Sequence, residues 1–391
     1  MPNTNAIVRL PGSMGDNQPI FDYTSSAPWE QVIKSYGTRD DVNRAVEDMV
    51  ANGKTKAECW ETIWDHEARR FETDGEFRAA VKQIYEAAGV DVLSVTPWTH
   101  DPNVSERAGQ RRDLSRWQAR FDAASWLRKV TSPDEARRVA NDNHVGIVLN
   151  TQNVGGAIDG SLNEIDVLYN EGVRIFQLTY NYQNLLGTGC NDSSEGGLST
   201  FGQAAVDRVN ELGGVVDVSH CGKRTTLDAI DYSDDPVAVT HATCQEVSYH
   251  YRGKSDEEIE ALAEADGYMG IVSLPWFIAP GADSPTLDVL VEHLDHAGSI
   301  LGLDSVGLGT DFYPADVRFP RGLLDYYKDH IIELGFDKEQ VEQRDIATGI
   351  GEFETYEDWS VIRNALEDRF SVAEVDGIVG ENFLHYWDRT I

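Results

Sequence analysis

The sequence predicts a (β/α)8 barrel, or TIM barrel, with additional N-terminal and C-terminal helices, and three observations lead to this α/β fold class. Eight short runs of apolar and β-branched residues recur along the chain. Most of the runs lack polar–apolar alternation, which is typical of parallel strands buried on both faces. Segments long enough for helices separate the runs, and eight is the number of strands that closes such a barrel. An open, doubly wound sheet is the alternative that this pattern allows.

The expected strands and helices follow in chain order. The eight strand candidates are Pro19–Asp22, Val90–Thr96, Val145–Asn150, Val173–Thr179, Gly214–His220, Val237–His241, Met269–Leu274 and Val306–Asp311. Thr200–Leu212 carries one apolar stripe at helical spacing, and the Gly213-Gly214 pair is expected to end that helix. Leu287–Leu301 repeats the stripe and predicts a second helix. We expect a single domain over 1–391, with helical additions at about 29–88, 103–143 and 320–391.

The charge of the chain limits its partners. The 391 residues include 33 Lys+Arg and 67 Asp+Glu, which gives a formal net charge of -34. Phosphate-rich nucleic acids and anionic membrane surfaces are therefore excluded as expected partners. The acidic residues are spread along the whole chain, and molar salt would screen their repulsion to a Debye length of ~3 Å. We expect a protein of a high-salt organism, with an ordinary acidic protein as the alternative.

The cysteines and the chain start indicate a compartment. Four cysteines in a chain of this length do not form a disulfide scaffold. The first residues lack the basic and apolar regions of a signal peptide, and no 18-residue apolar run is present. These features predict a cytoplasmic protein.

Polar side chains stand where several expected strands end. Two apolar runs end in His220 and His241, a third ends in Asp311, and the amides Gln152 and Asn153 follow a fourth. The C-terminal ends of barrel strands face the active site. Two imidazoles and a carboxylate suit Zn²⁺ or another divalent ion with water as a further ligand. The alternative is that each side chain only forms hydrogen bonds at its strand end.

Several short motifs occur in an order that resembles a known family. They are Gly172-Val173-Arg174, Leu178-Thr179-Tyr180-Asn181, Gly196–Gly202 (GGLSTFG), Asp217-Val218-Ser219-His220, Thr240-His241-Ala242, Gly309-Thr310-Asp311-Phe312 and Gly380-Glu381-Asn382-Phe383-Leu384. The ordered set is similar to the membrane dipeptidase (renal dipeptidase-like) metallopeptidases of the amidohydrolase superfamily. The resemblance is good from about Val145 to Phe312 and at the C-terminus, and poor over the first 140 or so residues.

The resemblance implies a two-zinc site in a (β/α)8 barrel, usually within a homodimer. It implies that His220 and His241 bind metal and that Asp311 handles the proton during hydrolysis. Arg252 falls where the family places an arginine on the substrate carboxylate, a group that a guanidinium binds through two parallel hydrogen bonds. The other interpretation of Arg252 is a solvent-exposed charge.

The sequence departs from the family at four positions. Thr24 and Ser26 stand where the family has the first strand's histidine and aspartate. Gln152, or Asn153 after a shift of one residue, replaces the bridging glutamate, and Tyr180 replaces a substrate-contacting histidine. A hydroxyl is a poor zinc ligand, and a neutral amide cannot balance two dications. We therefore expect one metal ion with His220, His241 and Asp311 as its ligands, and Gln152 as a weak ligand or a water-orienting group.

The sequence thus predicts a zinc-dependent hydrolase that cleaves a dipeptide or a similar small amide through a metal-bound hydroxide. Asp311 would move the proton, Arg252 would hold the carboxylate of a dipeptide-like substrate, and Tyr180 would contact the substrate. One alternative is a non-catalytic relative that binds a small carboxylated ligand or a partner. Another is a hydrolase of lactones or cyclic amides, because a shared fold does not fix function. A homodimer is the expected assembly.

Overall fold

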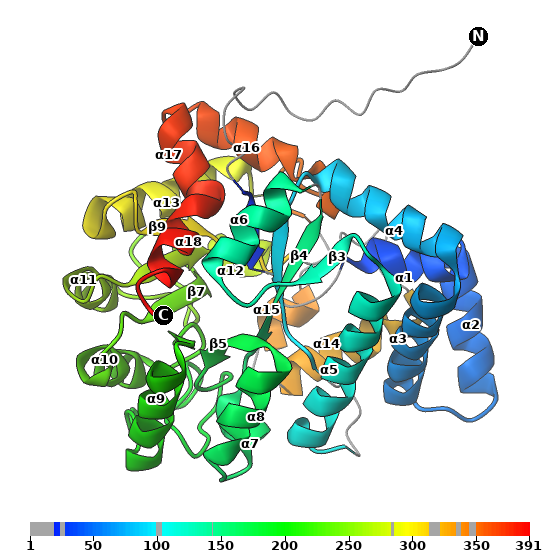
Figure 1. Cartoon of the computed structure of the whole chain (residues 1–391), viewed down its shortest axis with the longest axis horizontal. Coiled ribbons are helices and arrows are strands. Elements are labelled where there is room, and N and C mark those ends of the chain that lie inside the picture. The colour runs from blue at the N-terminus through cyan, green and yellow to red at the C-terminus, as the bar shows by residue number, and fades with distance from the viewer. Residues whose placement is uncertain are drawn as a thin grey trace.

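A nearly closed barrel of parallel strands forms the centre of the molecule (Figure 1). The computed structural model describes residues 19–23, 28–98, 104–142, 144–282, 285–312, 321–333, 338–343 and 349–391. In barrel order the strands are β1 (Phe21–Tyr23), β2 (Val92–Val95), β4 (Val145–Thr151), β5 (Val173–Gln177), β6 (Val215–Asp217), β7 (Ala238–Ala242), β8 (Tyr268–Ile271) and β9 (Val306–Leu308). Each of them overlaps one of the eight expected runs, so the predicted (β/α)8 barrel is confirmed.

Side-chain and backbone hydrogen bonds join the first strand to the end of the last one. The backbone N–H of Thr310 donates to Oδ1 of Asp22 over 3.0 Å, and its hydroxyl donates to Oδ2 over 2.8 Å. The backbone N–H of Asp311 donates to the carbonyl oxygen of Tyr23 over 3.0 Å. These bonds bring the edges of the sheet together, which an open, doubly wound sheet would not do.

Long helical insertions occupy the first third of the chain. Between β1 and β2 lie α1 (Trp29–Tyr36), α2 (Arg39–Ala51), α3 (Lys56–Thr73) and α4 (Gly75–Ala88). Between β2 and β4 lie α5 (Glu106–Ala123), the short strand β3 (Leu127–Lys129) and α6 (Pro133–Asn141). β3 pairs in parallel with β4 alone and lies outside the barrel order. This strand was not among the predicted ones, because three residues carry too little periodicity to separate them from a loop.

The remaining helices surround the barrel and follow its last strand. The surrounding helices are α7 (Val154–Ile158), α8 (Asn163–Glu171), α9 (Thr200–Leu212), α10 (Lys223–Tyr232), α11 (Asp256–Glu264), α12 (Pro275–Ile278) and α13 (Leu287–Leu301). After β9 come α14 (Arg321–Glu333), α15 (Lys338–Gln343), η1 (Tyr356–Asp358), α16 (Ser360–Glu367), α17 (Val372–Asp376), η2 (Gly377–Glu381) and α18 (Asn382–Trp387). Helices α9 and α13 have the predicted bounds. Ser199 caps α9, and Gly213 ends it with a φ of 72°.

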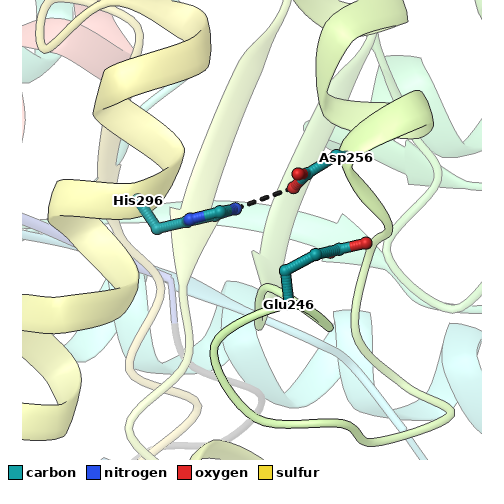
Figure 2. Close-up of side chains that lie close together, drawn as sticks. All are labelled: Glu246, Asp256 and His296. Carbon is teal, nitrogen blue, oxygen red and sulfur yellow. Dashed lines mark hydrogen bonds and ion pairs between the residues drawn. The ribbon is translucent and has the colours of Figure 1, made fainter.

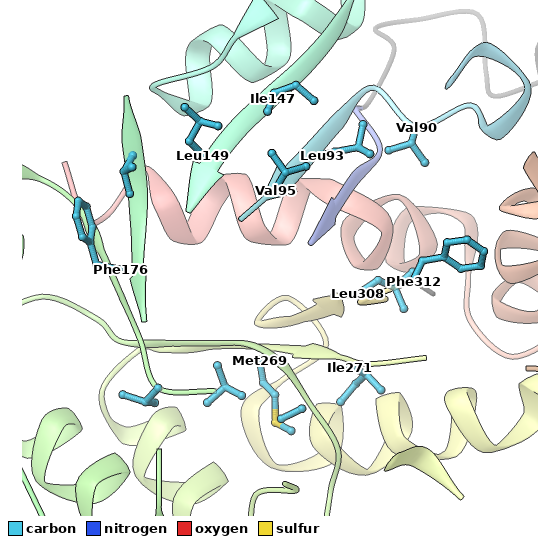
Figure 3. Close-up of a cluster of buried hydrophobic side chains, with 14 of the residues drawn as sticks. Val90, Leu93, Val95, Ile147, Leu149, Phe176, Met269, Ile271, Leu308 and Phe312 are labelled. Atoms are coloured by element: carbon cyan, nitrogen blue, oxygen red, sulfur yellow. The ribbon is translucent and has the colours of Figure 1, made fainter. Parts of the chain in front are cut away.

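Apolar side chains form two clusters on opposite faces of the barrel strands. Leu93, Val95 and their counterparts on neighbouring strands form the large cluster of Figure 3. Val92 has the opposite orientation and belongs to a second cluster, because successive strand residues point to opposite faces. In this second cluster Phe383 of α18 stacks on Phe21 of β1, with ring centroids 4.2 Å apart. Helix α18 therefore packs against the strand starts, at the end of the barrel away from the polar strand ends. Among the described residues, no helix has the length and apolarity that a membrane span requires.

Candidate metal centre and active site

Two histidines meet at the C-terminal mouth of the barrel. His220 follows the end of β6 by three residues, and His241 lies on β7. Their Nε2 atoms are 3.0 Å apart, and both residues are almost completely buried. Because β6 and β7 are parallel neighbours, their similar endings place both imidazoles at one edge of the sheet.

The opposite nitrogen of His220 is held by an amide. Nδ1 of His220 lies 2.7 Å from Oδ1 of Asn181, which is also buried. A carbonyl oxygen only accepts hydrogen bonds, so the Nδ1 of His220 carries the proton. The lone pair of its Nε2 then points toward His241.

A buried carboxylate sets the protonation of His241 through an intervening hydroxyl. The Thr240 hydroxyl donates to Oδ2 of Asp217 over 2.5 Å, so its oxygen can accept from Nδ1 of His241, 2.9 Å away. Asp217 also accepts from the backbone N–H and the hydroxyl of Ser219. Its pKa is raised by burial, while these hydrogen bonds act in the opposite direction. The resulting relay leaves the Nε2 lone pair of His241 facing His220.

The two facing lone pairs need a positive charge between them. A shared proton is disfavoured, because burial and then the positive charge of Arg252 lower the pKa of both histidines well below the usual value. Two imidazole nitrogens bound to one tetrahedral zinc ion lie about 3.3 Å apart, close to the observed spacing. Oxygen partners on the far nitrogens are the usual outer support of metal-binding histidines. The residues present therefore fit a divalent ion.

Two buried cations lie behind the histidines. Nη1 of Arg252 donates to the carbonyl oxygen of Ser219, and Nη2 donates to that of His241 over 2.9 Å. Lys254 donates to the carbonyl oxygen of Cys221 and to the Thr226 hydroxyl. Arg252 is only 2% exposed, so its interpretation as a solvent-exposed charge is wrong.

Aromatic rings enclose the pair. Tyr180 stacks on His220 with ring centroids 4.2 Å apart, and Tyr23 stacks on His241 at 4.6 Å. Trp98 lies against Tyr180 at 5.2 Å. Burial raises the pKa of both tyrosines, and the negative charge of Asp311 contributes in each case. The tyrosines therefore stay neutral at ordinary pH.

Asp311 and Gln152 are the other predicted metal-binding residues. Asp311 has a left-handed backbone, with a φ of 47°, and its charge acts on both tyrosines of the mouth. Gln152 follows β4, and its buried Nε2 has no hydrogen-bond partner among the described residues. No described carboxylate or thiol lies close enough to complete a three-ligand group with the two histidines. Metal binding by Asp311 and Gln152 stays a prediction, and Thr24 and Ser26 lie outside the described residues.

A second group of possible ligands occurs away from the mouth. Glu246, Asp256 and His296 offer ligand atoms that all lie within 4.8 Å of one another (Figure 2). Nε2 of His296 on α13 is 2.7 Å from Oδ1 of Asp256, the first residue of α11. The positive end of the α11 dipole opposes a cation there, so the contact is better explained as a link between two helices.

The residues that orient the histidines were not among the predicted site residues. Asn181 ends the motif Leu178-Thr179-Tyr180-Asn181, but nothing in the spacing indicates a bond to His220, 39 positions later. Asp217 interrupts the apolar run that ends in His220, and a carboxylate inside a buried strand was a usable signal. Lys254 carried no local signal, because its partners come from a different strand end.

Comparisons with known proteins find relatives that are named as dipeptidases. An uncharacterised dipeptidase of Schizosaccharomyces pombe is 32% identical over 208 residues, which are 52% of this chain and 50% of the relative. A second one from that yeast is 28% identical over 253 residues, covering 63% of this chain and 54% of the relative. The matches thus span about half the length of these curated relatives.

Solved structures share the fold. The crystal structure of dipeptidase AC, described as a metallopeptidase, superposes with a TM-score of 0.69 at 16% identity, over 96% of this chain and 99% of that one. A metallopeptidase from Rhodobacter sphaeroides, bound to a phosphinate mimic of L-Ala-D-Ala, gives 0.68 at 14% identity, over 96% and 100% of the two chains. Residues 54–352 match the family described as membrane dipeptidase (peptidase family M19). The chain belongs to this membrane dipeptidase family.

Proposed function

We propose that this protein is a metal-dependent hydrolase that cleaves a dipeptide or a similar small amide. The observation that carries the proposal is the pair of Nε2 atoms, 3.0 Å apart, on His220 and His241. In each imidazole, Nδ1 donates a hydrogen bond to an oxygen atom, so the lone pairs of the two Nε2 atoms face each other. Family membership and a metallopeptidase of the same fold support a bound metal ion, and zinc is the proposed ion because imidazole nitrogens suit it.

The chain's own residues supply the remaining functions. A divalent ion at His220 and His241 would supply Lewis acidity, which activates water and polarises a carbonyl group. Asp311 is the proposed proton carrier, because its negative charge acts on Tyr180 and Tyr23, the two rings that stack on the histidines. Gln152 is the proposed water-orienting group, since its buried Nε2 can donate to an oxygen.

Arg252 is the proposed contact for the substrate carboxylate. Its two terminal nitrogens each donate one hydrogen bond to a backbone carbonyl. A guanidinium has five N–H groups, so each terminal nitrogen keeps a second one. Tyr180, stacked beside His220, is the proposed wall of the substrate site. We propose in addition that the protein works as a cytoplasmic homodimer at high salt.

The first experiment is elemental analysis of protein purified in molar KCl, together with hydrolysis of a dipeptide panel. We expect about one zinc per chain, and turnover that is lost together with the metal in His220→Ala and His241→Ala. An exposed-site variant, His385→Ala, serves as the matched control. Absence of bound metal after zinc is offered, with no turnover, would contradict the proposal and favour the non-catalytic binding protein. Turnover of lactones alone would favour the other hydrolase class.

A further inference from the structure

A small cavity opens beside the proposed active site. It lies between the C-terminal ends of β2 and β4 and the helices α5 and α7, and Trp98, Glu106, Gln110 and Asn153 are among its lining residues. Its volume is about 20 Å³. A space of that size holds one water-sized group, which is also the size of an ammonium group.

The carboxylate of Glu106 is directed into this region by a glycine and an amide. Oε2 of Glu106 lies against Gly156, where an added Cβ would stand 1.4 Å from it and the flexible carboxylate would have to move. Nδ2 of Asn153 donates to the same Oε2 over 2.8 Å. Oδ1 of Asn153 in turn accepts from Nδ2 of Asn184, which fixes the orientation of the amide. Glu106 is an exposed residue at the edge of the cavity; partial burial of its carboxylate raises its pKa, and the bond from Asn153 acts in the opposite direction.

No described cation neutralises Glu106. The nearby arginines of the same helix, Arg107 and Arg111, both form ion pairs with Glu164 instead. Gln110 is 5% exposed, and its Oε1 has no hydrogen-bond partner in the described part of the chain. Glu106 and Gln110 therefore line one cavity in which Asn153 donates to the carboxylate, and the amide oxygen of Gln110 has no donor among the described residues. The face of an indole, here Trp98, also attracts cations.

Ring contacts connect the cavity with the metal centre. Trp98 lines the cavity and lies 5.2 Å from Tyr180, which stacks on His220. A group in the cavity is thus separated from the histidines by two aromatic side chains. The α-amino group of a substrate lies next to the reacting carbonyl, so it cannot reach past Trp98 and Tyr180 into the cavity. An amine at the end of a flexible four-carbon side chain is long enough to do so.

We propose that this cavity, lined by Glu106, Gln110 and Trp98, is a subsite for the side-chain ammonium group of a basic substrate residue. The assignment rests on the proposed hydrolase function. It adds a substrate class to that function: dipeptides or small amides that carry a lysine-like side chain.

Calorimetric titration of the full chain with n-butylammonium tests the subsite without any turnover. We expect n-butylammonium to bind, n-butanol not to bind, and Glu106→Gln to weaken n-butylammonium binding about tenfold or more. Gln110→Leu should weaken it as well. Glu260→Gln makes the same charge change on the exposed surface of α11 and should leave binding unchanged. Thermal melts of each variant establish that the fold is retained.

Two outcomes of this titration would overturn the subsite. Ammonium chloride or potassium chloride binding as tightly as n-butylammonium would show a site for small monovalent cations, with no role for a substrate side chain. Equal binding to Glu106→Gln and to the unmodified protein would show that the carboxylate does not recognise the ligand.

Kinetics separate the subsite from the function on which it rests. We expect kcat/KM to favour a lysine-containing dipeptide over its norleucine analogue, and Glu106→Gln to remove that preference while retaining turnover of the norleucine substrate. Turnover without a basic preference and without n-butylammonium binding would overturn the subsite alone. Binding of n-butylammonium with no turnover of any dipeptide would contradict the hydrolase function and leave the ammonium site supported.

Discussion

Lys254 donates a hydrogen bond from Nζ to the carbonyl oxygen of Cys221, 3.0 Å away and one residue after His220. Lys254 is 1% exposed, and Glu258 lies 3.3 Å from its Nζ as the counter-charge. Arg252 binds the carbonyl oxygen of Ser219 on the other side of His220. The backbone around this histidine is therefore held by two buried cations from the loop after β7.

Replacing Lys254 should weaken metal binding. We expect Lys254→Met to lower zinc affinity by roughly 10- to 100-fold, as loss of outer support for a metal ligand commonly does. Competition with a chromophoric chelator would measure the affinity. Lys223→Met is the matched control, because Lys223 forms an ion pair at the surface. Equal zinc affinity of the Lys254 variant and the unmodified protein would show that the cation does not position His220.

Asn181 offers a sharper test of the tautomer. Its φ of 55° lies in the left-handed region, which asparagine, aspartate and glycine tolerate better than other residues. We expect Asn181→Asp to retain zinc, since it keeps an acceptor for Nδ1 of His220. Asn181→Gly keeps the backbone conformation but removes the acceptor, and it should lose about tenfold or more in zinc affinity. Indistinguishable affinities of the two variants would contradict the assigned tautomer.

Asp22 should make stability depend on pH. Burial raises its pKa from 3.8 to about 6, although Thr310 and Tyr356 donate hydrogen bonds to it. The folded protein therefore holds this proton more tightly than the unfolded chain. This difference adds about 3 kcal/mol to the free energy of unfolding below pH ~4, and the added stability is lost as pH rises through ~6.

Asp22→Asn should remove this contribution, because a neutral amide mimics the protonated acid. Denaturant unfolding at pH values from 4 to 7.5 would compare the free energies of unfolding of the two proteins. The expected result is a flatter pH profile for the variant. A profile parallel to that of the unmodified protein would assign the pH dependence to other groups.

Salt should stabilise the fold, because the chain has a net charge of -34. Repulsion among acidic groups opposes the compact state, and molar KCl screens it. We expect the melting temperature to rise by ~5–10 °C between 0.1 M and 2 M KCl, which corresponds to a few kcal/mol. Sucrose at equal osmolality is the control for general exclusion effects. A melting temperature that does not respond to KCl would refute the predicted adaptation to high salt.

Local patterns were sufficient for the barrel but not for the contacts of the C-terminal helix α18. The apolar stripe of Thr200–Leu212 and its terminal glycine predicted helix α9 at the correct residues, because helix bounds depend on neighbours in the chain. The motif from Gly380 to Leu384 was recognised only as a family signature. In the fold, Asn382 donates to the carbonyl oxygen of Val306 over 2.7 Å and Phe383 stacks on Phe21. Asn382 and Val306 are 76 positions apart, and Phe383 and Phe21 come from opposite ends of the chain, so no local periodicity records these contacts.

The sequence by itself determined the eight barrel strands and the two histidines at neighbouring strand ends. Periodicity, β-branched runs and polar strand ends are local properties, and parallel strands convert order along the chain into order around a barrel. Only the tertiary structure decided that Asn181 and Thr240 orient the imidazoles, that Arg252 is buried, and that Glu106 and Gln110 share a cavity. Burial and hydrogen bonding depend on which distant segments meet, and that is settled by the packing of the whole chain.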